Sequence, residues 1–410
     1  MNTATTVTSS RSDAAVISVI GAVHAISHFF QLVFPALFPW LMREFSLSYT
    51  SIGLTMTVFF AISGTGQAIA GFAVDRFGAR PVLLFGMIML TLSALLLAAA
   101  NSSETLFLAA AVAGCGNAVF HPADYTLLNR LVSQPRLGHS FSVHGLTGTL
   151  GWAAAPVFMA GIAGLTSWRV AASAACGIGC LGVFVVLWQR GLLVYGHHLQ
   201  RAEKGDAAQT STFGFLASRD VWMCFAFFLL WTFAASAVQN FGPAALANMY
   251  GMSLTLASSS VTAYMLGSAA GTIKGGFLVK KGSPERSIAL GLIVGALIAL
   301  FLASGAAPVT GVIPLMAVMG FGAGIAGPSR DMLVRNSATS GAGVASYGRI
   351  YGFVYSGLDM GLALSPLLFG RFMDASQFAQ VLAGIAAFQV LAILTAWRIG
   401  SIRPASMQRS

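Results

Sequence analysis

Long apolar segments alternate with short polar turns along most of this chain. Because about 20 predominantly apolar residues in a helix cross the hydrocarbon core of a bilayer, each segment of that length predicts a membrane-spanning helix. The pattern predicts twelve spans, at residues 15–41, 50–74, 81–100, 105–129, 138–165, 168–189, 219–248, 254–279, 284–305, 309–334, 346–370 and 375–398. We therefore expect an all-α membrane protein.

One long polar connection, RGLLVYGHHLQRAEKGDAAQTSTFG, divides these spans six and six. The apolar segment after the polar N-terminus is too long for a signal-peptide core, so we expect it to remain as the first span. The division predicts an N-terminal tail (1–14), a six-helix bundle (15–189), a central loop (190–218), a second six-helix bundle (219–398) and a C-terminal tail (399–410).

The composition and the placement of charges agree with a membrane protein. Only 8% of the residues are charged, against about a quarter in a soluble chain. With both termini in the cytoplasm, all but four of the 22 Lys and Arg residues lie on the cytoplasmic side; Arg43, Arg169 and Arg371 lie outside and Lys274 lies in a span. The net charge of +10 therefore reflects orientation in a bacterial inner membrane, with the lipid bilayer as partner and no nucleic acid.

The two halves share an internal repeat. Shifts of 204 to 210 residues superpose GFAVDRFG (71–78) on GGFLVKKG (275–282) and align several glycines and prolines of the fourth and fifth spans with those of the tenth and eleventh. The aligned pairs are Gly114/Gly320, Gly116/Gly322, Pro122/Pro328, Gly151/Gly361 and Pro156/Pro366. Parallel repeats with a substrate site between them are typical of secondary transporters.

The stretch GFAVDRFGAR (71–80) closes the second span and resembles the cytoplasmic loop signature of the major facilitator superfamily, G-x-x-x-D-R-x-G-R-R. The matching residues are Gly71, Asp75, Arg76, Gly78 and, at the last basic position, Arg80; Ala79 replaces a basic residue. The resemblance covers the whole chain and implies the major facilitator fold, with twelve transmembrane helices in two six-helix halves.

The same resemblance implies a gate at the cytoplasmic face. In that family the acidic residue of the motif holds the halves together in one state and releases them in the other. Carried over, Asp75 would engage the start of the eleventh span (346–348) and Arg130. Glycine takes positive φ freely, so Gly78 suits the sharp turn that follows.

Polar side chains inside the spans are costly, so each is a candidate for substrate or proton binding. In the first half the candidates are His24, His28 and Gln31 on one face of span one, Asn117, His121 and Asp124 around Pro122 in span four, and His144 in span five. In the second half they are Gln239, Asn240, Tyr264, Lys274, Arg349, Tyr351, Tyr355 and Asp359.

Asp359 is the carboxylate that the sequence places deepest in the membrane. We expect it to carry the coupled proton, and the alternative is a structural ion pair with Lys274 or Arg349. Pro35 and Pro39 should loosen the outer half of span one, since proline removes a helical hydrogen bond. The four cysteines (Cys115, Cys176, Cys180 and Cys224) lie in apolar stretches and predict small buried side chains without disulfides.

Span five contains GLTGTLGWAAAP, which is similar to the Gly/Pro signature of proton-coupled drug antiporters, with Gly148, Gly151 and Pro156 as helix-bending residues. The FHPAD stretch, followed by a histidine- and glycine-rich span, also resembles the fosmidomycin-resistance branch of the superfamily. These resemblances imply a proton-coupled exporter of a small anionic or amphipathic drug or metabolite.

Motifs for other energy sources and for enzymes are absent. The chain has no G-x-x-x-x-G-K-[ST] loop and no H-E-x-x-H, so we expect a transporter driven by an ion or solute gradient, and no enzyme, cofactor or metal site. Its partners would be a small-molecule substrate and a proton or other coupling ion, and the protein would be a monomer. Three alternatives stay open: an importer of a small organic anion, a metal carrier that uses the intramembrane histidines, and a membrane sensor with a transporter fold.

Overall fold

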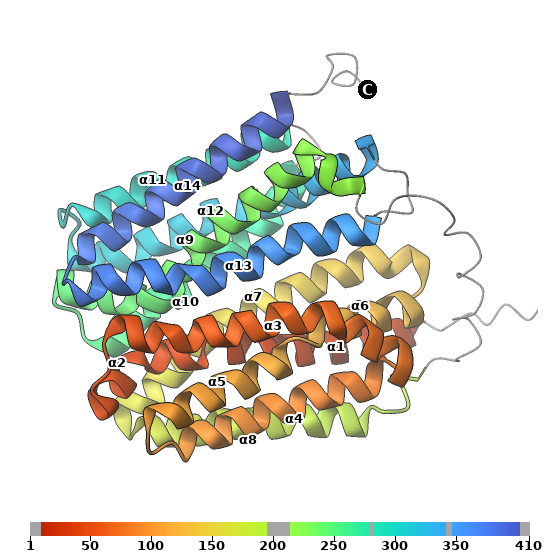
Figure 1. Ribbon diagram of the computed structural model, residues 1–410, viewed down its shortest axis with the longest axis horizontal. Coiled ribbons are helices and arrows are strands. Elements are labelled where there is room, and N and C mark those ends of the chain that lie inside the picture. Colours follow the sequence, from red (N-terminus) through yellow and green to blue (C-terminus); the bar gives the residue numbers. More distant parts are fainter. Residues whose placement is uncertain (1–9, 195–213, 279–282, 342–346, 402–410) are drawn as a thin grey trace, which may run out of the picture.

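The computed structural model describes residues 10–194, 214–278, 283–341 and 347–401, and this part of the chain is almost entirely helical (Figure 1). The helices of the first half are α1 (Ser10–Gln31), α2 (Val33–Phe45), α3 (Tyr49–Phe77), α4 (Ala79–Ala98), α5 (Ser103–Asn117), α6 (Phe120–Leu131), α7 (Gln134–Leu165) and α8 (Trp168–Trp188). The second half begins with a short 3-10 helix, η2 (Gly214–Ala217), and continues with α9 (Arg219–Tyr250), α10 (Leu254–Leu278), α11 (Pro284–Ala303), α12 (Val309–Gly341), α13 (Tyr347–Asp374) and α14 (Phe378–Ser401). The prediction of an all-α chain is confirmed.

Two of the predicted spans are each built from two helices. A turn at Leu32 separates α1 from α2, and a turn at 118–119 separates α5 from α6. In both places a proline follows shortly, Pro35 in α2 and Pro122 in α6. Because proline has no N–H, it cannot bond to the carbonyl four residues earlier, which removes a hydrogen bond at each of these turns. The helix α2 continues unbroken through Pro39, so the expected loosening of the outer half of span one is seen only as the break before Pro35.

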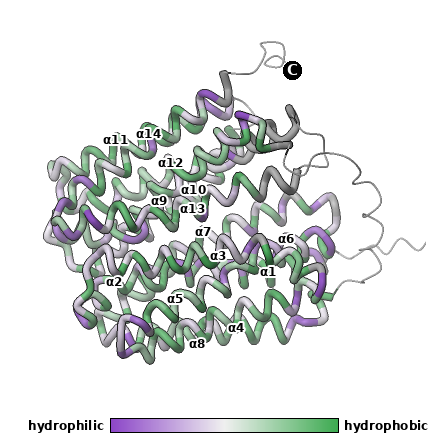
Figure 2. Tube along the Cα trace, in the orientation of Figure 1, coloured by the Kyte–Doolittle hydropathy of each residue, from purple (hydrophilic) through white to green (hydrophobic). Residues whose placement is uncertain are grey.

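Ten segments of the described chain are long and apolar enough to cross a membrane. The helices α3 and α10 are not among them. Both pack along other helices, α3 against α13 and α5, and α10 against α12 and α7, and small residues permit such close approach. Figure 2 shows hydrophilic residues gathered toward the ends of the helices and hydrophobic residues along their middle. The arrangement fits twelve spans.

The internal repeat is visible in the packing of equivalent glycines. Gly151 of α7 lies against the backbone of α1, and its counterpart Gly361 of α13 lies against the backbone of α9. Likewise Gly114 of α5 lies against α3, and Gly320 of α12 lies against α10. A Cβ on any of these four residues would overlap the neighbouring backbone. The two halves therefore use the same helix contacts in the same order.

The halves meet chiefly along two helix pairs, α3 with α13 and α7 with α10, with a smaller contact between α2 and α9. The first pair runs side by side through the middle of Figure 1. Hydrogen bonds cross both contacts: Thr57 Oγ1 donates to the carbonyl of Ala363 over 2.7 Å, and Thr262 Oγ1 donates to the carbonyl of Ala153 over 2.7 Å. Polar groups on these facing helices therefore lie between the halves.

The cysteines depart from the sequence prediction. None of the four takes part in a disulfide, and Cys224 is buried, but Cys115 and Cys180 are exposed and Cys176 is partly exposed. The prediction of four buried side chains is therefore wrong. An apolar segment of a membrane helix has one face toward other helices and one toward lipid, and hydropathy alone does not distinguish the two faces.

Candidate functional site

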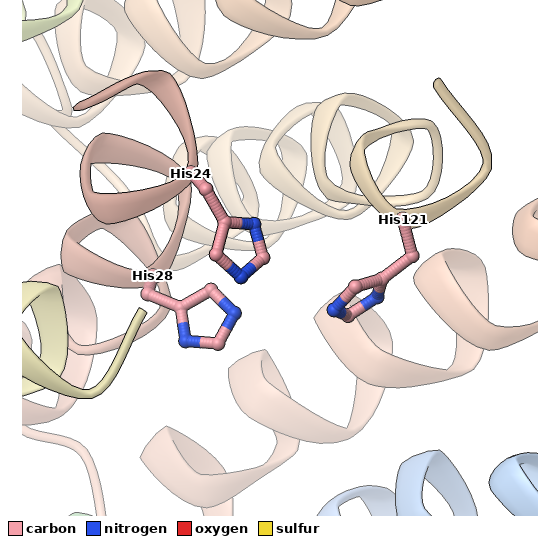
Figure 3. A group of neighbouring side chains, drawn as sticks. All are labelled: His24, His28 and His121. Atoms are coloured by element: carbon pink, nitrogen blue, oxygen red, sulfur yellow. The ribbon is translucent and has the colours of Figure 1, made fainter. Parts of the chain in front are cut away.

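Four imidazoles gather inside the first half, His24 and His28 from α1, His121 from α6 and His144 from α7. The ring centroids of His24 and His28 are 4.3 Å apart, and those of His24 and His144 are 3.5 Å apart with the rings stacked. The ring of His121 lies 5.4 Å from that of His24. Figure 3 shows the rings of His24, His28 and His121 turned toward one another. The structure thus brings together side chains that are separated by up to 120 positions in the sequence.

A buried carboxylate holds two of these rings. Asp124 Oδ2 lies 3.0 Å from His24 Nδ1 and 3.1 Å from His144 Nε2, while Oδ1 has no hydrogen-bond partner among the described residues. Asp124 is 0% exposed and Asp359 is partly exposed, so Asp124 is the more buried of these two carboxylates. Hydropathy locates a residue along a span, but the packing of neighbouring helices determines the exposed fraction of its side chain.

A second polar group lies at the two helix breaks. Gln31 ends α1 and Asn117 ends α5, and Gln31 Nε2 donates to Asn117 Oδ1 over 3.0 Å. Asn117 Nδ2 donates to Ser63 Oγ over 2.8 Å, and Trp152 Nε1 donates to Gln31 Oε1 over 3.1 Å. The ring of Trp152 lies 4.3 Å from that of His28. The amides therefore continue the imidazole cluster toward α3 and α7.

Gln67 of α3 connects the cluster to the second half. Its Nε2 donates to Asp359 Oδ2 of α13 over 2.8 Å, and its Oε1 lies 3.3 Å from His121 Nδ1. Because an amide oxygen only accepts, His121 donates its Nδ1 proton to Gln67. Sequence reasoning missed Gln67, although a lone amide four residues after Ser63 in span two was a signal for it.

Gly148 makes room for the imidazoles. A Cβ at this position of α7 would lie 2.9 Å from His24 Nε2 and 2.9 Å from His28 Nδ1. The helix continues unbroken through Pro156. Gly148 and Gly151 therefore lie where α1 approaches α7, and their lack of a side chain permits that approach.

The candidates in α9 and α10 lie apart from the imidazole cluster. Gln239 and Asn240 are buried in α9, where Asn240 Nδ2 donates to Ser236 Oγ over 2.9 Å and Asn240 Oδ1 has no hydrogen-bond partner in the part of the chain that the structure describes. Tyr264 is buried in α10, and Lys274 is exposed near the end of the same helix.

The alternative role of Asp359 as a partner of Lys274 is not seen. Among the described residues its contact is the amide of Gln67, and no ion pair joins it to a lysine. Tyr355 packs on Phe228, with ring centroids 4.9 Å apart, inside the second half. The side chains of Arg349 and Tyr351 lie outside the described residues.

The turn after α3 has the geometry that its sequence predicts. Gly78 has φ 88°, a conformation that glycine adopts without strain, and it ends α3 and precedes α4. Arg80 donates to the carbonyl of Arg190 over 3.3 Å, and Arg76 is exposed with its guanidinium 5.4 Å from the ring of Phe77. No atom lies within 4 Å of a Cβ built on Gly71.

The expected latch falls largely outside the described part of the chain. This applies to the side chain of Asp75 and to the side chains of residues 346–348. Arg130 is described and is exposed at the end of α6. The role of Asp75 in the gate therefore stays a prediction.

Comparison with known proteins places this architecture in a family. The sequence profile of the Major Facilitator Superfamily matches residues 20–366. The fosmidomycin resistance protein of Escherichia coli (strain K12) is 27% identical over 282 residues, which are 67% of each chain. A multidrug resistance protein B homolog of Mycobacterium tuberculosis (strain ATCC 25618 / H37Rv) is 29% identical over 128 residues, 31% of this chain and 24% of that protein.

Two solved structures share the fold. The bacterial homolog to the human lysosomal transporter Spinster, in an inward-facing and unoccupied conformation, gives a TM-score of 0.75 at 14% identity and covers 96% of both chains. The nucleoside transporter NupG (D323A mutant) gives a TM-score of 0.75 at 14% identity, over 94% of this chain and 99% of that one. With a profile match over most of its length and this helical architecture, the chain belongs to the major facilitator superfamily of membrane transporters.

Proposed function

We propose that this protein is a proton-coupled exporter, an antiporter that moves a small anionic or amphipathic drug or metabolite across a bacterial inner membrane by alternating access. Relatives named for fosmidomycin resistance and multidrug resistance support export. In this proposal the protein works as a monomer, both termini lie in the cytoplasm, and the six-helix bundles 15–189 and 219–398 move against each other.

The observation that carries the proposal is the bridge formed by Gln67 between the halves. Alternating access requires contacts between the halves that break and reform in each cycle. The Gln67 amide contacts His121 of the first half and Asp359 of the second, at 3.3 Å and 2.8 Å, within the membrane-spanning helices. When a carboxylate takes part in such a contact, the binding of one proton to the carboxylate changes the strength of the contact.

Protonation of Asp359 would alter this bridge directly. The ionised carboxylate accepts a charge-assisted hydrogen bond from Gln67 Nε2, and such bonds are roughly twice as strong as neutral ones. A proton bound to Asp359 would weaken the bond and favour separation of α3 from α13. Release of the proton on the other side of the membrane would restore it. Proton movement and the rearrangement of the halves would in this way be coupled.

The substrate would contact polar groups that face the space between the halves. We assign this role to the amides of Gln31 and Asn117, to Trp152, and to Gln239 and Asn240 from the opposite half, because these side chains supply hydrogen bonds in an otherwise apolar interior. Asp75 and Arg130 would close the cytoplasmic side.

The first test measures whether the protein exports drugs from cells and whether that export needs a proton gradient. Cells that lack their own efflux carriers would express the protein, and accumulation of fosmidomycin and a panel of labelled anionic drugs would be measured with and without an uncoupler. We expect lower accumulation that the uncoupler reverses. Higher accumulation on expression would instead support the importer, and accumulation unchanged by the uncoupler would contradict proton coupling.

The variant Asp359→Asn separates coupling from binding. In liposomes containing the purified protein, it should abolish transport driven by a pH gradient and leave substrate exchange at equal pH largely intact. Glu104→Gln is the matched control, since Glu104 is an exposed carboxylate at the start of α5, and it should behave as wild type. Gradient-driven transport by Asp359→Asn at the wild-type rate would exclude Asp359 as the proton carrier.

A further inference from the structure

We infer that His24, His28 and His121 form a binding site for one divalent transition-metal ion of the Zn²⁺, Co²⁺ or Ni²⁺ class. One ring nitrogen of each residue lies within 4.8 Å of the others, and the three rings face a common point in Figure 3. The sequence left open a metal carrier that uses the intramembrane histidines, but it could not place these three together, because two lie in α1 and the third follows almost a hundred residues later in α6. The site does not depend on the proposed export function.

Two of the imidazoles are already held in the tautomer that a metal requires. His24 Nδ1 contacts Asp124 Oδ2 and His121 Nδ1 donates to Gln67 Oε1, so the Nε2 atom of each ring retains its lone pair. Metal-binding histidines characteristically donate their other N–H to a carboxylate or carbonyl oxygen, which fixes the ring and makes it a stronger ligand. Asp124 and Gln67 are positioned to do this.

His28 supplies the independent observation that points to a ligand. Its side chain is 8% exposed, and neither of its ring nitrogens meets a hydrogen-bond partner of full geometry among the described residues. Burying a polar group without a partner is unfavourable, so such groups are rare in folded proteins. Coordination of a metal ion by one nitrogen of His28 would remove part of this cost.

The charge and geometry of the cluster favour this class of ion. Neutral imidazoles suit zinc, cobalt and nickel, whereas magnesium and calcium prefer oxygen ligands. The carboxylate of Asp124, in contact with His24, would balance part of the dication's charge. Zinc sites with three protein ligands leave a fourth position for water or another molecule. Because Zn–N bonds of 2.0–2.1 Å place tetrahedral ligand atoms about 3.4 Å apart, the rings would close slightly on binding.

The experiment titrates Co²⁺ into the purified full-length protein in detergent and follows the visible absorption of tetrahedral cobalt, with Zn²⁺ as competitor. We expect one Co²⁺ per chain, displaced by Zn²⁺. His28→Gln and, separately, His121→Gln should remove the absorption. Asp124→Asn should weaken binding by about 10–100-fold, the effect typical of losing a residue that orients a ligand. Melting temperatures without metal would show that each variant is folded.

The control variant removes the histidines outside the cluster, as His139→Gln combined with His197→Gln and His198→Gln. His139 is exposed on α7, and His197 and His198 lie in the central loop. This variant should bind Co²⁺ as the wild type does. Loss of binding in the control, unchanged binding in folded His28→Gln and His121→Gln, or no binding by the wild type would each overturn the inference.

Discussion

The carboxylate of Asp374, at the end of α13, accepts a hydrogen bond from the backbone N–H of Tyr49, the first residue of α3, over 2.5 Å. The adjacent N–H of Thr50 donates to the other oxygen over 3.0 Å. The first N–H groups of a helix lack partners within the helix, and the positive end of its dipole favours an anion. One turn earlier in α13, Gly370 packs directly on Thr50. A residue of the second half thus caps a helix of the first and joins the halves at the end of the bundle where α3 begins.

Replacing Asp374 should loosen this end of the bundle. Asp374→Ala removes a cap worth on the order of 1 kcal/mol, which corresponds to a roughly fivefold shift toward separation of the halves. A cysteine at Thr57, which bonds to Ala363 across the α3–α13 contact, should then react faster with maleimide in purified protein that has no other cysteine. Glu44→Ala is the control, because Glu44 pairs with Arg169 at the exposed surface of one half. Equal labelling rates in all backgrounds would show that the cap does not hold the halves together.

Adding a methyl group beside the imidazoles should disturb them. Gly148→Ala would place a Cβ 2.9 Å from ring atoms of His24 and His28, so the rings or α1 must shift. We expect a loss of about 1–3 kcal/mol, typical of overpacking, and reduced transport. Gly145→Ala, one turn earlier in α7, meets no atom within 4 Å and should gain up to about 1 kcal/mol from helix propensity. Thermal unfolding of the two variants measures the contrast, and equal melting temperatures would contradict it.

The internal repeat should be visible in stability as well. Gly151→Ala and Gly361→Ala each place a Cβ against the backbone of the equivalent helix, α1 in one half and α9 in the other. We expect both to lower the melting temperature and the yield of folded protein, since the helices would have to separate. Gly161→Ala, also in α7, meets no neighbouring atom and serves as the control. A tolerated substitution at only one of the two equivalent sites would show that the halves do not share this packing requirement.

The contact between Gln67 and Asp359 should appear as an energetic coupling. In a double-mutant cycle of Gln67→Leu and Asp359→Asn, residues in direct contact give an interaction energy of about 0.5–3 kcal/mol in unfolding free energy. Gln67→Leu combined with Asp374→Asn is the control, because these two side chains make no hydrogen bond to each other. Additive effects for the first pair would mean that the bridge makes no net contribution to stability.

Labelling can test the orientation drawn from the basic residues. A cysteine at Asn101, which is exposed between α4 and α5, should react in intact cells with an impermeant reagent. A cysteine at Ser211, in the central loop, should not react. Both are made in a background without Cys115 and Cys180, which are exposed on the helices. The reverse labelling pattern would place the termini outside the cytoplasm.

The sequence alone determined most of the fold, because each span is specified by its own composition. Hydropathy located the helices, and the offset of Gly151 from Gly361 revealed the repeat that the packing then displayed. Proline removes one helical hydrogen bond wherever it occurs, but the helices continue through Pro39, Pro156 and Pro366. The sequence therefore marked Pro35 and Pro122 as possible break points without determining that the helices break there. The turn at Gly78 could be anticipated, since a positive φ favours glycine.

The tertiary structure decided which polar groups meet. The sequence marked His24, His121 and Asp124 as candidates, but their contacts depend on how α1, α6 and α7 are rotated about their axes. Gln67 and Asp374 became significant only when α3 and α13 were seen side by side, because each makes its contact with the opposite half. The hydrophobic effect places all of these helices in the membrane, but it only weakly selects the rotation of each helix about its own axis. Only the packing of small residues and the pairing of buried polar groups fix the rotation, and both depend on residues distant in the chain.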